Sequence, residues 1–217
     1  MKKDRILSHR GKKNLQDLGN NYLSFQDAIK SGYGLETDIR DFNGRLYISH
    51  DIALKTPDIS FESFLNLIIN NRSSSPIALN IKTSGSTNLI NEYREKLELI
   101  NYFFFDMAIP DHLTFTKSKF INAIRVSEFE IITEAMLKNL SPKWIWYDSL
   151  LGEQDEVWVQ SLKDLIKYDL NICIVSSELH GANPYKLWEK LKLNFDFNNQ
   201  NLYICTDLPD KVFNFFN

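Results

Sequence analysis

The chain has 217 residues, with 25 Lys and Arg side chains against 28 Asp and Glu, and a formal net charge of -3. Its 43% content of hydrophobic residues is sufficient for a buried core, which excludes intrinsic disorder and fibrous architectures. The balance of charge excludes a protein whose affinity comes from neutralising nucleic-acid phosphates. The length suits one ordinary domain, and we expect residues 1–217 to form it.

Short apolar runs alternate with longer amphipathic segments along the whole chain. The short runs predict strands at residues 5–8, 34–39, 77–82, 102–106, 121–126, 144–148, 171–176 and 202–206. The longer segments predict helices at residues 23–31, 61–70, 88–99, 133–139, 156–168 and 185–193, with the weakest helical signal at 110–119. Parallel pairing needs long crossovers, so this order predicts a single-domain α/β fold, a closed (β/α)8 TIM barrel. A doubly wound open sheet is the alternative.

Two of the predicted strands carry polar side chains on one face. These side chains are Glu36, Asp38 and Arg40 in the second strand, and Asn80 and Lys82 in the third, each opposite an apolar face. In a barrel the apolar face of a strand packs against the helices, so we expect these polar groups inside the barrel near its C-terminal mouth. Charges buried there must be paired or bind a metal.

Two of the four histidines follow predicted extended segments. His9 comes directly after the first strand, and His50 follows the short extended run 46–49. We expect both to reach the same mouth as Glu36 and Asp38. Two imidazoles near two carboxylates make a site able to hold a hard divalent cation on oxygens and to move protons with nitrogens.

The remaining histidines and the cysteines favour ordinary structural interpretations. His112 is typical of a helix start, and we interpret His180 as a loop residue, with contact to substrate as the alternative. Cys173 and Cys205 lie in apolar runs and are expected to be buried free thiols. We find no signal for a secretory leader or a membrane span, so we expect a cytoplasmic protein without membrane insertion.

A set of motifs in the first 51 residues resembles the glycerophosphodiester phosphodiesterase family, a group of TIM barrels related to phosphoinositide phospholipases. The motifs are His9-Arg10-Gly11, Glu36-Thr37-Asp38-Ile39-Arg40, Gly44 and His50-Asp51. The similarity continues more weakly through residues 79–82, and Thr206-Asp207-Leu208-Pro209 is similar to the family's closing Thr-Asp-x-Pro. Each fragment alone is weak, but the combination is specific.

The resemblance implies a metal-dependent phosphodiesterase of lipid metabolism. In it His9 and His50 act as general acid and base, and Glu36 and Asp38 hold one divalent cation, Mg²⁺ or Ca²⁺. Its substrate would be a small phosphodiester, a glycerophosphodiester or a related sugar-phosphate diester. A cation offsets the negative charge that repels a nucleophile, and an imidazolium protonates the leaving alcohol. Arg10 and Lys82 are suited to binding the phosphate oxygens.

One position departs from the family pattern. Asn80 stands where the family usually has a metal-binding Glu. An amide oxygen coordinates a cation without adding charge, so we expect weaker binding or recruitment of another carboxylate, with Asp106 at the end of the fourth strand as the nearest candidate. A hydrogen-bonded interior amide is an equally good interpretation of Asn80.

Two other functions remain open at this point. The short segment after His50-Asp51 and the presence of Asn80 favour, as an alternative, a phosphodiesterase or phosphoryl transferase acting on a surface or capsule-type glycan phosphate. A non-catalytic barrel that binds a phosphate ligand is the other alternative. A binder needs no proton-transfer groups, and the presence of both His9 and His50 therefore argues for an enzyme.

Overall fold

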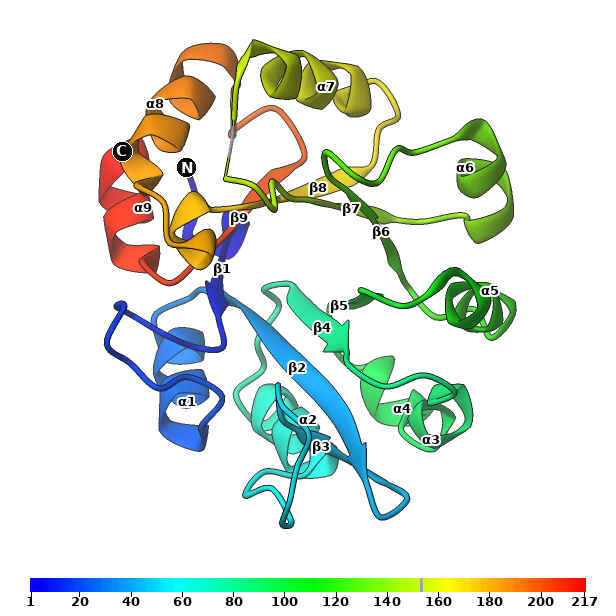
Figure 1. Ribbon diagram of the computed structural model, residues 1–217. Helices are drawn as coiled ribbons and strands as arrows, with labels where there is room; N and C mark the ends of the chain where they lie inside the picture. Colours follow the sequence, from blue (N-terminus) through cyan, green and yellow to red (C-terminus); the bar gives the residue numbers. More distant parts are fainter. Residues whose placement is uncertain (153) are drawn as a thin grey trace.

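The computed structural model describes residues 1–152 and 154–217. Within them, eight parallel strands form a barrel: β1 (Ile6–His9), β2 (Gly34–Phe42), β4 (Ile77–Ile81), β5 (Tyr102–Phe105), β6 (Ala123–Val126), β7 (Trp144–Tyr147), β8 (Asn171–Val175) and β9 (Leu202–Thr206). Figure 1 shows the helices lying outside these strands. The hydrogen-bonded order is β5-β4-β2-β1-β9-β8-β7-β6, and a parallel bridge between Phe104 and Asn122 joins its two ends. The predicted closed barrel is confirmed, and the open sheet is excluded.

The helices cover the outer faces of the strands. They are α1 (Tyr22–Lys30), α2 (Phe61–Asn70), α3 (Thr87–Asn91), α4 (Arg94–Leu97), α5 (Ile109–Lys117), α6 (Glu134–Leu140), α7 (Glu156–Ile166), α8 (Pro184–Asn194) and α9 (Pro209–Phe216), with 3₁₀ turns η1 (Lys3–Arg5) and η2 (Ser177–His180). Side chains that accept a hydrogen bond from the first turn cap five of these helices: Asn21, Ser60, Thr133, Asp155 and Asn183. The segment predicted as one helix at 88–99 is two short helices, with Tyr93 as the N-cap of α4.

One strand lies outside the barrel. β3 (Arg45–Ile48) pairs antiparallel with the far end of β2, through a turn at Asn43 and Gly44 in which both residues have positive φ. The sequence predicts an extended run here but not this pairing. The hairpin lengthens β2 beyond the neighbouring strands, and it decides where His50 lies.

The barrel interior is filled mainly by large aromatic side chains. Phe103 and Phe105 point inward, while Tyr102 and Phe104 pack against the helices, as strand alternation requires. Phe103 stacks on Trp144 with ring centroids 4.2 Å apart, and Phe105 stacks on Trp146 at 4.0 Å. The interior is therefore a packed core, and polar chemistry is confined to the mouth.

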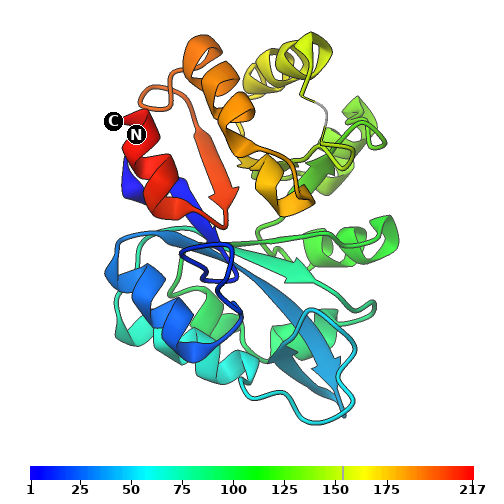
Figure 2. The same ribbon diagram turned by 60° about the vertical axis from the view of Figure 1, so that its left-hand side comes forward.

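Several sequence-based expectations concern the rest of the molecule. Cys173 and Cys205 are buried and free, as expected. No helix in the two described ranges combines the length and apolar character needed to cross a bilayer. The two ends of the chain lie side by side (Figure 2), where the amino group of Met1 donates a hydrogen bond to Asn217 Oδ1 at 3.1 Å.

Candidate active site

A cavity of about 370 Å³ opens at the carboxyl ends of the strands. Its lining includes nearly all the polar residues that the sequence places at the mouth, together with several that it does not: His9, Arg10, Lys12, Glu36, Asp38, Asn80, Lys82, Asp106, Arg125, Asp148, His180 and Asp207. The stacked pair Phe105 and Trp146 also lines this cavity, together with Leu150, Val175 and Leu179. Charged groups thus stand above an apolar base that limits their hydration.

His9 is held by a carboxylate from the neighbouring strand end. β1 and β9 are adjacent and in register at Ser8 and Thr206, so His9 and Asp207 leave the barrel together. Asp207 Oδ1 lies 2.6 Å from His9 Nδ1, and Asp207 Oδ2 lies 3.1 Å from Lys12 Nζ. A carboxylate accepts, so Nδ1 carries the proton and Nε2 is left able to take one. Nε2 faces Glu36 Oε2 at 3.7 Å.

The same contacts keep Asp207 ionised. Burial acts to raise the pKa of Asp207, but its hydrogen bond to His9 and the nearby charges of His9 and Lys12 hold that pKa below its ordinary value. The sequence suggests Asp207 only through the Thr-Asp-x-Pro motif. The structure explains the position of this Asp, because the first and last barrel strands are neighbours and Asp207 therefore reaches His9. Lys12, three residues beyond His9, has no comparable sequence signal.

A buried glutamate supports this pair from below. The carboxylate of Glu178, on η2, accepts hydrogen bonds from the backbone N–H of Asp207 at 3.1 Å and from the hydroxyls of Ser176 and Thr206. Ser176 in turn accepts from Trp188 Nε1 at 2.9 Å. Both oxygens of Glu178 are thereby satisfied, and the backbone that carries Asp207 is fixed.

Three oxygens on the opposite side have no such partners. Asp38 and Asn80 are register neighbours on β2 and β4, and Glu36 precedes Asp38 on the same face. One oxygen of each side chain is buried without a hydrogen-bond partner: Glu36 Oε2, Asp38 Oδ1 and Asn80 Oδ1. Burial and the negative charge of Asp38 raise the pKa of Glu36 well above its ordinary value, against the opposing charges of Arg10 and Lys82.

This oxygen cluster suits a hard divalent cation, the kind of ion that the family resemblance implies. Its donors are two carboxylates and one amide carbonyl, the ligand types that Mg²⁺ and Ca²⁺ prefer. In the part of the chain that the structure describes, no group of three or more His, Cys, Asp or Glu side chains has metal-binding geometry, and the third oxygen of this cluster is the amide oxygen of Asn80. The unpaired oxygen of Asn80 favours a ligand over a satisfied interior amide.

Basic side chains surround the cluster. Arg10 Nε lies 2.9 Å from Asp38 Oδ2, and Lys82 Nζ lies 3.5 Å from Asp38 Oδ1. Arg10 has a φ of 54°, followed by Gly11 at 74°. A Cβ on Gly11 would lie 2.9 Å from the ring of Phe25, so this turn requires glycine and aims the guanidinium across the mouth.

The predicted alternative ligand Asp106 lines the cavity but is held by cations. Its Oδ1 lies 2.6 Å from Arg125 Nη1, and its Oδ2 lies 3.6 Å from Lys82 Nζ. Arg125 also forms a two-pronged pair with Glu130, at 2.6 and 2.9 Å. Asp106 therefore neutralises side chains on the rim, on the far side of Lys82 from Asp38.

His50 does not line the cavity. Its side chain is 44% exposed, and its Nδ1 lies 2.8 Å from Asp51 Oδ1. Arg40, which the sequence places on the inner face of β2, donates to the backbone oxygen of His50 at 3.0 Å instead. The β2–β3 hairpin carries both residues to the outer rim, whereas all the other predicted site residues come together.

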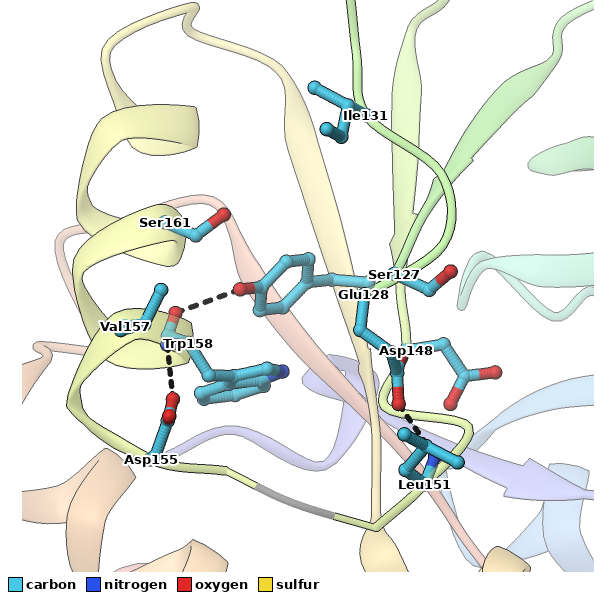
Figure 3. A pocket seen from close by; sticks show the side chains of 10 residues that line it. Ser127, Glu128, Ile131, Asp148, Leu151, Asp155, Val157, Trp158 and Ser161 are labelled. Carbon is cyan, nitrogen blue, oxygen red and sulfur yellow. Dashed lines mark hydrogen bonds between the residues drawn. The ribbon is translucent and has the colours of Figure 1, made fainter.

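A different histidine lines the cavity. His180 ends η2, and its Nε2 lies 2.7 Å from Asp148 Oδ1, at the end of β7. Asp148 also lines a neighbouring cavity of about 340 Å³, shown in Figure 3 with Ile131, Val157 and Trp158 among its walls. The indole Nε1 of Trp158 is buried there with no hydrogen-bond partner. A loop histidine gives too little sequence signal to predict this position.

Comparison with known proteins supports the fold. No protein-family model and no curated protein sequence matches this chain. It is similar to a solved phosphodiesterase from Oleispira antarctica in complex with the product sn-glycerol-3-phosphate (TM-score 0.71, 15% identity, 97% of this chain and 96% of that chain).

Two further solved structures agree. They are the glycerophosphodiester phosphodiesterase from Agrobacterium tumefaciens (TM-score 0.66, 14% identity, 98% of each chain) and a glycerophosphoryl diester phosphodiesterase from Parabacteroides distasonis (TM-score 0.67, 12% identity, 99% of this chain and 87% of that chain). The resemblance predicted from the sequence is confirmed at the level of the fold: this chain is a TIM barrel of the shape that glycerophosphodiester phosphodiesterases have.

Proposed function

We propose that this protein is a divalent-metal-dependent phosphodiesterase that hydrolyses a glycerophosphodiester or a related sugar-phosphate diester. The observation that carries the proposal is one juxtaposition. His9, an imidazole held by a carboxylate, lies beside three buried oxygens that have no hydrogen-bond partner, with Arg10 and Lys82 next to them, in a barrel shaped like known phosphodiesterases. The product found in the Oleispira structure supports a small glycerol-containing substrate.

The acidic, basic and imidazole side chains of the site would have different roles. Glu36, Asp38 and Asn80 would hold the cation, which when bound offsets negative charge on the phosphate and polarises it. Arg10 and Lys82 would bind the nonbridging phosphate oxygens, because guanidinium and ammonium groups pair with them by charge-assisted hydrogen bonds. His9 Nε2 would take the proton from the attacking hydroxyl group or water, and Asp207 would stabilise the imidazolium that results.

The experiment is hydrolysis of glycerophosphocholine by the purified protein, with released choline measured after adding Mg²⁺, Ca²⁺ or chelator. We expect turnover that depends on the cation and falls in His9→Asn. Lys13→Ala is the matched control, because Lys13 lies in the same loop but pairs with Asp27 at 3.1 Å in solvent. Tight binding without turnover, unchanged in His9→Asn, would favour the binding barrel, and turnover only of a glycan phosphodiester would favour the capsule-type alternative.

A further inference from the structure

The cavity contains a second imidazole on the side opposite the oxygen cluster. His180 lies on η2 after β8, and its side chain is 26% exposed. It lines the same cavity as His9, whereas His50 does not. His180 is thus, with His9, the second histidine that lines this cavity.

The hydrogen bonds of His180 determine which nitrogen is available. Asp148 Oδ1 accepts from His180 Nε2 at 2.7 Å and from the backbone N–H of Ser149 at 2.8 Å. The carboxylate fixes the ring and keeps a proton on Nε2. No residue in the described part of the chain forms a hydrogen bond with Nδ1 of His180, so Nδ1 is the nitrogen that can exchange a proton with a ligand.

The strand order places His9 and His180 after different strands of the same barrel mouth. β9 lies between β1, which ends in His9, and β8, which leads to His180. His180 is held by Asp148 at the end of β7, one strand further from β1, so the two imidazoles belong to separate parts of the mouth. A phosphodiester bound in the cavity that both imidazoles line would therefore have one of them on each side.

The two sides of the cavity differ in the side chains that line them. Arg10, Lys82 and the oxygen cluster lie on the β1, β2 and β4 side, where the phosphate charge would rest. Beyond Asp148, on the other side, lies the cavity of Figure 3, with its apolar walls and the unpaired N–H of Trp158. A phosphate bound by these basic side chains would therefore face one wall, and the alcohol portion of the substrate would point toward His180.

We propose that His180 is the general acid of the reaction, donating the proton of Nδ1 to the oxygen of the departing alcohol. The inference rests on the proposed phosphodiesterase function and names a catalytic residue for it. Water bonds to phosphorus through its oxygen and gives one proton to His9 Nε2. The bond from phosphorus to the alcohol oxygen breaks, its electron pair stays on that oxygen, and the His180 proton completes the alcohol. The products are a phosphomonoester and a free alcohol, and proton exchange with solvent resets both rings.

The charges that face His180 favour the protonated form that an acid requires. The hydrogen bond and charge of Asp148, with the charges of Glu128 on the β6 side and Glu178 on η2, raise the pKa of His180 above its ordinary value, although burial opposes them. Asp148 is thus a positioning residue that also keeps the acid charged.

The test compares two substrates that differ in their need for an acid. Choline and glycerol leave poorly as alkoxides, whereas nitrophenolate leaves without a proton. In His180→Gln the amide can still donate to Asp148 but cannot transfer a proton. We expect kcat for glycerophosphocholine to fall about 10²-fold or more, with less than about threefold loss on bis-nitrophenyl phosphate. Asp148→Asn should move the alkaline limb of the glycerophosphocholine profile to lower pH.

His50→Gln provides the matched comparison, because family resemblance assigns the second proton-transfer role to His50. Leaving-group-dependent loss in His50→Gln, with wild-type rates in His180→Gln, would overturn the inference and leave the phosphodiesterase function intact. Equal losses on both substrates in His180→Gln would also overturn it, since that result marks a structural role. His180→Ala serves as the second variant if thermal denaturation shows that His180→Gln is unfolded. Absence of turnover of either substrate by the wild-type protein would instead overturn the proposed function.

Discussion

The two walls of the barrel mouth satisfy their polar groups in opposite ways. The oxygen wall, formed by Glu36, Asp38 and Asn80 on β2 and β4, has three buried oxygens without hydrogen-bond partners. The imidazole wall, formed by Asp148, Glu178, His180 and Asp207 beyond β7, β8 and β9, pairs its carboxylates with imidazoles, hydroxyls and backbone N–H groups. One wall leaves oxygens without hydrogen bonds, and the other pairs its carboxylates while leaving Nδ1 of His180 open to a ligand.

This difference has an energetic meaning. A buried polar atom without a partner costs about 1–3 kcal/mol of stability, which a bound ligand can return as affinity. A buried network in which every polar atom has a hydrogen-bond partner carries no such cost in stability. Removing one member leaves its partners buried without hydrogen bonds, and the protein is then destabilised. Substitutions on the oxygen wall should therefore affect binding more than folding, and substitution of Glu178, which only supports the imidazole wall, should affect folding.

The largest expected effect is at His9, which contacts both walls. His9→Asn should lower kcat for glycerophosphocholine by about 10²–10⁴-fold, because it removes the proton acceptor nearest the oxygen cluster. Circular dichroism and thermal denaturation should show a folded protein. A rate within threefold of wild type would contradict both the role of His9 and the division into two walls.

The next effect concerns cation binding to the oxygen wall. In wild type, a cation at 100 times its dissociation constant should raise the free energy of unfolding by about 2.7 kcal/mol, and Glu36→Gln should lose most of that increase. Without a cation, we expect Glu36→Gln to be as stable as wild type or slightly more stable, because the amide carries no buried charge. Glu62→Gln is the control, since Glu62 is exposed and paired with Lys96. Equal cation-induced shifts in both variants would remove Glu36 from the ligand set.

On the imidazole wall we expect a loss of folding stability instead. Glu178→Gln replaces an acceptor of three hydrogen bonds with a group that has only one acceptor oxygen. The free energy of unfolding in urea should fall by about 1–3 kcal/mol, with or without a cation. A stability equal to that of wild type would show that the network beneath Asp207 is dispensable.

The smallest effect is the pH dependence contributed by His180. Its pKa is raised in the folded state, so its contribution to stability is fully present below the unfolded pKa and is lost as pH rises through the folded pKa. The stability difference between wild type and His180→Gln should therefore be largest in mildly acidic buffer and should shrink toward alkaline pH. Urea titrations across this range test it, and a difference that grows with pH would contradict the charge arrangement around Asp148.

Much of the fold could be predicted from local pattern. Alternation placed Glu36, Asp38, Asn80 and Lys82 on inner faces, and in a parallel barrel all strand ends of one kind meet at one mouth. The alternation of side chains along a strand, and the rule that parallel strands end at one mouth, were sufficient to predict where these residues lie.

Other parts of the site depend on contacts between distant segments. Asp207 meets His9 across 198 residues because the first and last barrel strands are neighbours, and Asp148 meets His180 across 32. His50 follows an extended run as expected, but the pairing of β3 with β2 carries it to the rim. The sequence alone thus determined which side chains face inward, because alternation along a strand is local. Only the tertiary structure decided which of them become partners, because partnership depends on strand order and on how far each strand extends before it turns.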